Sequence, residues 1–110
     1  MIAEAVLALA LGALNEVPDA IGPGGQTWTY EFTDVVERSG KVVVIFNVWE
    51  DRPVSEPDFV WLDRECELDG FDGETLGGEL GRFTDAVQLC LYQYESGDRP
   101  IARPGDKRKK

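Results

Sequence analysis

The clearest pattern in the chain is the alternation of aromatic and polar residues over residues 27–36, with the aromatic side chains on one side. Such alternation is typical of a strand with one buried face. Residues 42–49 read VVVIFNVW, and an apolar run of this kind on both faces predicts a central strand. Because only residues 37–41 separate the two strands, we predict an antiparallel hairpin.

A third strand is predicted over residues 59–68, after a loop that contains Pro53 and Pro57. In a regular strand, alternate residues share a face. One face of this strand would then carry Val60, Leu62, Cys66 and Leu68, interrupted by Arg64. The opposite face would carry Phe59 and Trp61, followed by Asp63, Glu65 and Glu67.

Two helices are predicted at the two ends of this strand region. Residues 3–15 are rich in Ala and Leu, and Pro18 prevents the helix from continuing. Residues 76–95 carry apolar side chains at spacings of three and four, which indicates an amphipathic helix with Thr75 as a candidate N-cap. The alternative is a fourth strand over residues 87–94, where apolar residues also alternate.

Together these elements predict one α+β domain with an N-terminal helix, a three-stranded or possibly four-stranded antiparallel sheet and a C-terminal amphipathic helix. We assign residues 1–96 to this acidic domain and residues 97–110 to a flexible basic tail. The apolar start lacks a basic leading segment and carries Glu4, so we interpret it as a retained helix rather than a signal peptide. We therefore expect a cytoplasmic protein, or another intracellular or virion component, that is not secreted and does not bind membranes.

Composition excludes several kinds of chemistry. The chain has no histidine, which excludes histidine-dependent catalytic triads and metal sites that need imidazole. Two cysteines cannot form a four-cysteine zinc or iron–sulfur site within one chain. We expect Cys66 and Cys90 to be free buried thiols, with a disulfide as the alternative. These features predict a protein that is not an enzyme and has no cofactor.

The charge is unevenly distributed along the chain. The net charge is −10, but six bases and one acid lie in residues 99–110, which leaves five bases and twenty acids in residues 1–98. A body this acidic is repelled by nucleic acid and by anionic membranes, so a basic protein surface is the partner it favours.

The acids are densest between residues 50 and 79, which hold eleven of the twenty-one. The candidate partner-facing acids are Asp63, Glu65, Glu67, Asp69, Asp72 and Glu74. A calcium loop counted from Glu65 has Leu76 at its closing position, where an acidic ligand is needed. A carboxylate-based metal-dependent enzyme would lack a nearby lysine or histidine. The functional interpretation of these acids is a row that binds a basic partner. The structural interpretation is an acidic face that is only solvated.

Two apolar features add further hypotheses. Trp28, Trp49 and Trp61 are interpreted as core residues, with the floor of a ligand pocket as the alternative. The first helix is apolar on almost all sides, so we expect Leu7, Leu11 and Leu14 to contribute to an interface with a second copy or a larger assembly. The leading prediction is thus an acidic accessory, inhibitor or assembly subunit. A scaffold subunit whose acidity serves solubility and a metal-dependent enzyme are the alternatives.

Overall fold

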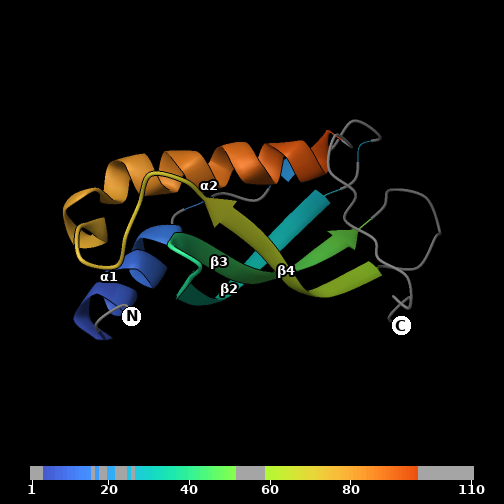
Figure 1. Ribbon diagram of the computed structural model, residues 1–110. Helices are drawn as coiled ribbons and strands as arrows, with labels where there is room; N and C mark the ends of the chain where they lie inside the picture. Colours follow the sequence, from blue (N-terminus) through green and yellow to red (C-terminus); the bar gives the residue numbers. More distant parts are fainter. Residues whose placement is uncertain are drawn as a thin grey trace.

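The computed structural model describes residues 4–15, 17, 20–21, 25, 27–51 and 59–96, and shows an α+β fold in which helices pack on a sheet (Figure 1). In chain order the elements are helix α1 (Glu4–Leu14), strands β1 (Ala20–Ile21), β2 (Thr27–Arg38), β3 (Lys41–Asp51) and β4 (Phe59–Leu68), the 3₁₀ turn η1 (Leu76–Gly78) and helix α2 (Leu80–Glu95). The predicted fold class is confirmed. The predicted tail lies outside the described residues.

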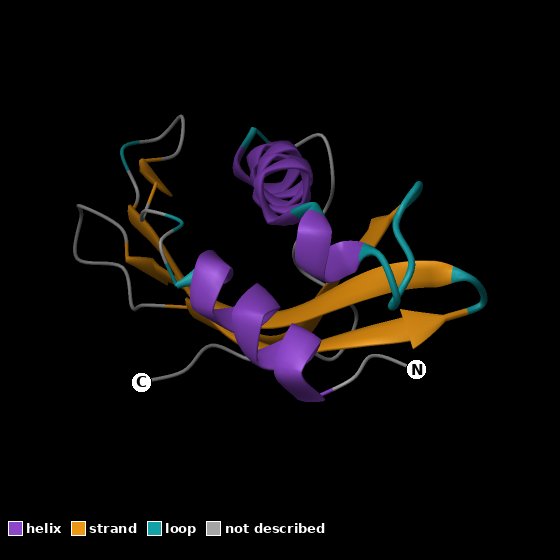
Figure 2. Cartoon of the chain, turned by 90° about the vertical axis from the view of Figure 1, so that its left-hand side faces the viewer, coloured by secondary structure: helices purple, strands orange, loops and turns teal. Residues whose placement is uncertain are grey.

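The sheet is antiparallel, with the strand order β1-β2-β3-β4. The predicted hairpin of β2 and β3 closes through Ser39 and Gly40, whose φ angles of 53° and 77° are both positive. A two-residue turn of this kind matches the right-handed twist of the flanking strands. Both helices bury side chains against one face of the sheet, hereafter the inner face; the opposite face is the outer face. In Figure 2, α2 lies above the sheet and α1 crosses in front of it.

The C-terminal helix begins later than predicted. Residues 76–78 form the 3₁₀ turn, and α2 then runs from Leu80 to Glu95. The side chain of Thr75 makes no capping hydrogen bond; instead Asp72 Oδ1 accepts hydrogen bonds from the backbone N–H groups of Glu74 and Thr75, at 2.8 and 2.9 Å. The alternative of a strand over residues 87–94 is wrong because they are helical. The additional strand is the two-residue β1, which the sequence pattern did not predict.

A bulge in β4 changes which side chains face the core. Phe46 pairs with Arg64 and Val48 pairs with Trp61, so Leu62 and Asp63 together lie opposite the single residue Asn47. One extra residue reverses the alternation of the strand beyond it. Trp61 is therefore buried on the inner face together with Arg64, whereas Leu62 is 55% exposed. The predictions that Trp61 shares a face with the acids and that Leu62 shares one with Cys66 are wrong.

The core lies between the inner face and the two helices. Ala10 and Leu14 of α1 and Phe83 of α2 pack with the inner-face residues of β2 and β3, such as Phe46. All four are essentially inaccessible to water. The other buried members of this cluster are Trp28, Val35, Val42, Val44, Val48, Trp61, Cys66, Leu68, Phe71, Leu76, Val87, Cys90, Leu91 and Tyr94.

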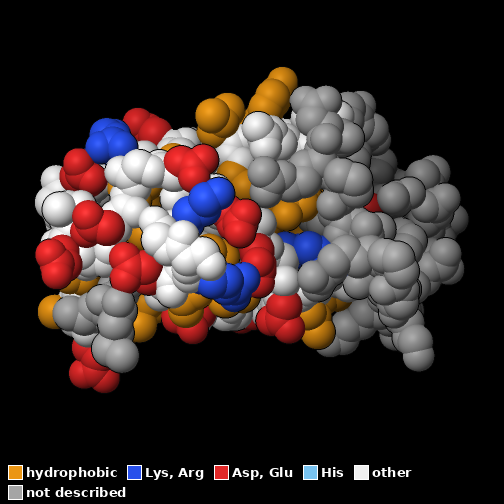
Figure 3. Space-filling view, viewed as in Figure 1, with side chains coloured by type: hydrophobic (Ala, Val, Ile, Leu, Met, Phe, Trp, Pro, Cys, Tyr) orange, Lys and Arg blue, Asp and Glu red, His pale blue; other side chains and the backbone are white. Residues whose placement is uncertain are grey.

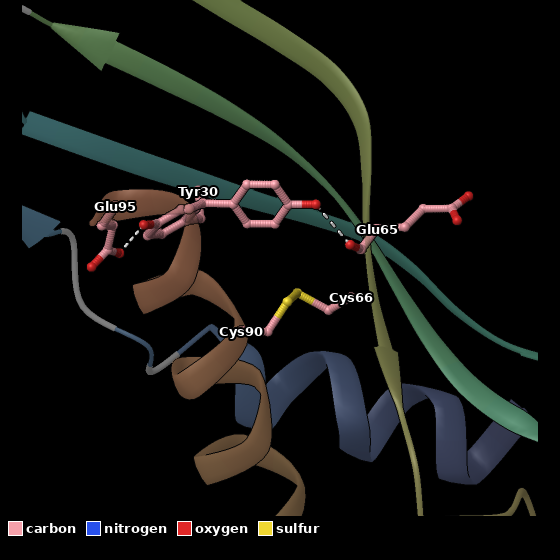
Figure 4. Close-up of a disulfide and its surroundings, with 6 residues drawn as sticks. Tyr30, Glu65, Cys66, Cys90 and Glu95 are labelled. Carbon is pink, nitrogen blue, oxygen red and sulfur yellow. Dashed lines mark hydrogen bonds between the residues drawn. A yellow bond between two sulfur atoms is a disulfide. The ribbon is translucent and has the colours of Figure 1, made fainter. Parts of the chain in front are cut away.

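Cys66 and Cys90 form a disulfide, so the expectation of two free thiols is wrong. The bond links the inner face of β4 to the sheet-facing side of α2, with the two Cα atoms 6.1 Å apart (Figure 4). Both residues project into the same core from facing elements, which brings them within bridging distance. Twenty-four positions separate them in sequence, and that separation alone gives no indication of their contact.

Candidate functional site

The outer face of the sheet holds most of the predicted acidic residues. The pairing of the strands places Glu31 of β2, Asn47 of β3 and the Leu62–Asp63 bulge of β4 in one row across this face. The next row consists of Asp34, Ile45 and Glu65. The row after it consists of Val36, Val43 and Glu67. The outer face therefore carries acids on both β2 and β4, with the residues of β3 between them.

The predicted acids divide into two groups in the structure. Asp63, Glu65 and Glu67 lie along the outer face of β4, whereas Asp69, Asp72 and Glu74 lie in the segment that leads from β4 to η1. All are exposed except Glu65, which is half-buried. The structure thus keeps the first three together as a row and places the other three beyond the end of the strand.

Some of these acids already have partners within the chain. Glu65 forms an ion pair with Arg38 at 2.9 Å, and Asp69 forms one with Lys41 at 3.3 Å. These pairs are exposed, and exposed pairs are weak, about 0–1 kcal/mol, so a partner could displace them at small cost. Among the described residues, no cation lies within ion-pair distance of Asp63 or Glu67.

Asp72 has a structural role. The hydrogen bonds that it accepts from the backbone N–H groups of Thr75 and Glu74 favour its charged form and hold its pKa below the usual value for aspartate. The same turn is attached to the sheet, because Glu37 of β2 accepts a hydrogen bond from the backbone N–H of Gly73 at 3.0 Å. Asp72 therefore organises the turn between β4 and η1.

The centre of the outer face is apolar where the acids flank it. Ile45 of β3 is half-buried between Asp34 and Glu65. Beyond Asn47, Trp49 of β3 and Val60 of β4 form a second half-buried apolar pair, and the neighbouring Leu62 is more than half exposed. Val43, farther along β3, is fully buried. An apolar stripe flanked by charge is a surface that a partner with both apolar and basic side chains can cover.

Asn47 connects the two sides of this face. Its Nδ2 donates to Glu31 Oε1 at 3.0 Å, and its Oδ1 accepts a hydrogen bond from the backbone N–H of Asp63 at 3.0 Å. Asp63 has a φ of 56°, a left-handed conformation that is uncommon outside glycine. Asn47 therefore stabilises the bulge that directs Asp63 outward.

The three tryptophans do not form one pocket floor. Trp28 and Trp61 stack on the inner face with ring centroids 6.1 Å apart, as the core interpretation predicts, whereas Trp49 lies on the outer face. Trp28 Nε1 is buried and has no hydrogen-bond partner among the residues that the structure describes.

Two buried charged residues were not predicted as such. Glu50 and Arg64 are only 3% and 2% exposed, and Arg64 Nη1 donates to the carbonyl of Leu62 at 2.9 Å. The one signal in the sequence was the position of Arg64 within an otherwise apolar alternation. The bulge turns that position toward the core, where an arginine must satisfy its donors internally.

The end of α2 is attached to the sheet by two tyrosines. The Tyr94 hydroxyl donates to the carbonyl of Glu65 at 3.0 Å, and the Tyr30 hydroxyl donates to Glu95 Oε2 (Figure 4). Together with the disulfide, these contacts fix α2 over β4 and hold the backbone of the acidic row against a rigid support.

The predicted interface residues of α1 face mainly inward. Leu14 is fully buried, and Leu7 and Leu11 are half-buried against the core. The leucine of α1 that is available to another chain is Leu9, which is 55% exposed. The hypothesis that α1 contributes to an interface stays a prediction, but its exposed face differs from the one expected.

The described residues contain no group of three acidic or cysteine side chains arranged to hold a metal ion. No helix among them is long and apolar enough to cross a membrane. The cytoplasmic location stays a prediction, and the disulfide weighs against it, because such bonds persist mainly in oxidising compartments.

Comparison of the chain with protein families, with curated proteins and with solved structures finds no match. The functional argument therefore depends on the chemistry of this chain's own surface.

Proposed function

We propose that the protein is a non-enzymatic interaction protein that binds a basic segment of a partner protein across the outer face of its sheet. The observation that carries this proposal is the arrangement of acidic and apolar side chains on that face. Acids on β2 and β4 lie on either side of the half-buried Ile45 of β3, and the apolar pair of Trp49 and Val60 lies farther along the same face. The two helices pack in the core against the inner face instead.

The spacing of the strands supports an amphipathic helix as the bound segment. Neighbouring strands lie about 4.8 Å apart, so the acids of β2 and β4 stand about 10 Å from each other. This is close to the width of an α-helix with its side chains, about 10–12 Å. A helix whose apolar side lies along β3 would bring lysines or arginines on its two flanks to the two acidic strands.

The overall charge supports the same kind of partner. In the described part of the face that Figure 3 shows, Asp and Glu side chains outnumber Lys and Arg side chains. An acidic surface accelerates association with a basic partner and makes the affinity depend on salt. The alternative, a scaffold subunit whose acidity serves only solubility, predicts no preference for any particular face.

The test is calorimetric titration with a synthetic helical peptide that carries leucines on one face and lysines on both flanks. We expect binding that weakens with salt, and Glu67→Lys on β4 should weaken it about tenfold. Asp85→Lys, at an exposed position of α2, changes the net charge equally and is the matched control. Equal losses in the two variants would show a general charge effect, and no binding at low salt would contradict the proposal.

A further inference from the structure

A groove lies between α1 and the start of α2. It has a volume of about 310 Å³ and is open to solvent on one side. Its lining residues are Ala13, Val17, Leu80, Gly81, Thr84 and Gln88. None of them is charged, in a chain in which 29% of the residues are charged. The groove is on the helical side of the molecule and does not involve the outer face of the sheet.

Leu9 stands at the edge of this groove. It precedes Ala13, a lining residue, by one helical turn, so the two side chains lie on the same side of α1. More than half of its surface is exposed, although α1 buries Ala10 and Leu14 in the core. A protruding leucine therefore lies beside a recess lined by uncharged apolar and polar residues.

No contact among the described residues requires glycine at Gly12 or at Gly81. A Cβ atom built at Gly12 of α1, or at Gly81 in the groove wall, would meet nothing within 4 Å, and neither has a positive φ. Glycine weakens a helix relative to alanine. Because no contact within the described chain requires glycine at either position, the space is available to a second molecule.

We propose that two copies of this chain associate through α1 as a two-fold symmetric dimer, with Leu9 of each copy seated in the groove of the other. In a two-fold interface the same patch serves on both partners, so a surface that holds both the protrusion and the recess is self-complementary. Each contact then occurs twice and buries two exposed leucines.

The charge distribution permits a second copy as the occupant. Two chains of net charge −10 repel each other wherever acids face acids. Residues 5–14 of α1 carry no charge, and the groove lining is uncharged as well. At its edge, Glu79 and Arg82 of α2 form an ion pair at 2.9 Å. Contact through this patch would not bring the carboxylates of the two acidic chains close together.

Sedimentation equilibrium of the full chain, from tens to hundreds of micromolar, tests the dimer. We expect a species of twice the 12.2 kDa chain mass, and added salt should strengthen the association because it screens the repulsion between the two bodies. Binding of a basic peptide weakens with salt, so this dependence separates the dimer from the proposed function. A wild-type chain that stays monomeric at hundreds of micromolar would overturn the inference.

Three uncharged substitutions test the geometry. Leu9→Gln removes the protrusion, Gly81→Gln fills the recess, and each should weaken the dimer about tenfold. Leu89→Gln is the matched control, because Leu89 is 63% exposed on another side of α2 and should leave the dimer unchanged. A Cβ atom at Gly81 meets nothing within 4 Å, so Gly81→Gln remains decisive even if Leu9→Gln impairs folding. A dimer that tolerates Gly81→Gln would contradict the seating of Leu9 in the groove.

Discussion

Asn47 Oδ1 accepts a hydrogen bond from the backbone N–H of Asp63 at 3.0 Å, across the β4 bulge that decides which residues of the strand face outward. Without the bulge, Trp61 would share the outer face with the acidic row. The bulge instead keeps Trp61 in the core, stacked on Trp28, and leaves Leu62 and Asp63 exposed together. One amide side chain thus supports both the core and the candidate site.

We predict that Asn47→Ala lowers the free energy of unfolding by about 1 kcal/mol, because it removes the hydrogen bonds to Asp63 and Glu31. Urea denaturation measures the change. Thr29→Ala, at an exposed position of β2 on the same face, is the control and should change stability by less than about 0.5 kcal/mol. If the two variants are equally stable, backbone pairing alone holds the bulge.

We predict that loss of the Cys66–Cys90 disulfide destabilises the fold by about 3 kcal/mol, since the bond closes a loop between residues 24 positions apart. The double variant Cys66→Ala/Cys90→Ala should melt at a lower temperature than the oxidised wild type. Adding a reductant should lower the melting temperature of the wild type and leave that of the double variant unchanged. A wild-type melt that does not respond to complete reduction would rule out a stabilising bridge.

We predict that Asp72 contributes to stability in a pH-dependent way. Its pKa is lowered in the folded state by hydrogen bonds from the backbone N–H groups of Thr75 and Glu74. The contribution is therefore present above the pKa of the unfolded chain, and it is lost as the pH falls through the lower pKa of the folded state. Stability should fall less on acidification in Asp72→Asn, which keeps one acceptor oxygen but does not titrate, than in the wild type.

Urea midpoints at neutral and at acidic pH measure this difference. The control is Glu74→Gln, which removes a neighbouring carboxylate that accepts neither of these hydrogen bonds. Parallel pH profiles for Asp72→Asn and the wild type would contradict the assignment.

The sequence predicts the hairpin well because its signals are local. Alternation in β2, the apolar run of β3 and the short connection over residues 37–41 all indicate the same pairing. The turn is shorter than predicted, because the strands pair up to Arg38 and Lys41. The bulge at Asp63 was not predictable, because it depends on a side chain of the neighbouring strand. The disulfide was missed for a similar reason: it depends on how α2 lies over β4.

The candidate site was predictable only in part. Alternation in the second half of β4 correctly grouped Asp63, Glu65 and Glu67, but the prediction did not place the acids of β2 on the same face. The orientation of α1 was also undetermined, because a helix that is apolar on all sides has no polar face to indicate which leucines are buried. Packing on the sheet buries Leu14 and leaves Leu9 exposed.

Mapping of the peptide-binding surface by NMR chemical-shift perturbation tests the central claim most directly. The protein, labelled with ¹⁵N, is titrated with the lysine-flanked helical peptide at low salt. We expect the largest shifts at the amides of Ile45, Asn47 and Glu65 and at the indole of Trp49, all on the outer face of the sheet. Shifts concentrated on α1 or α2, or spread evenly over all exposed acids, would contradict a binding site on that face.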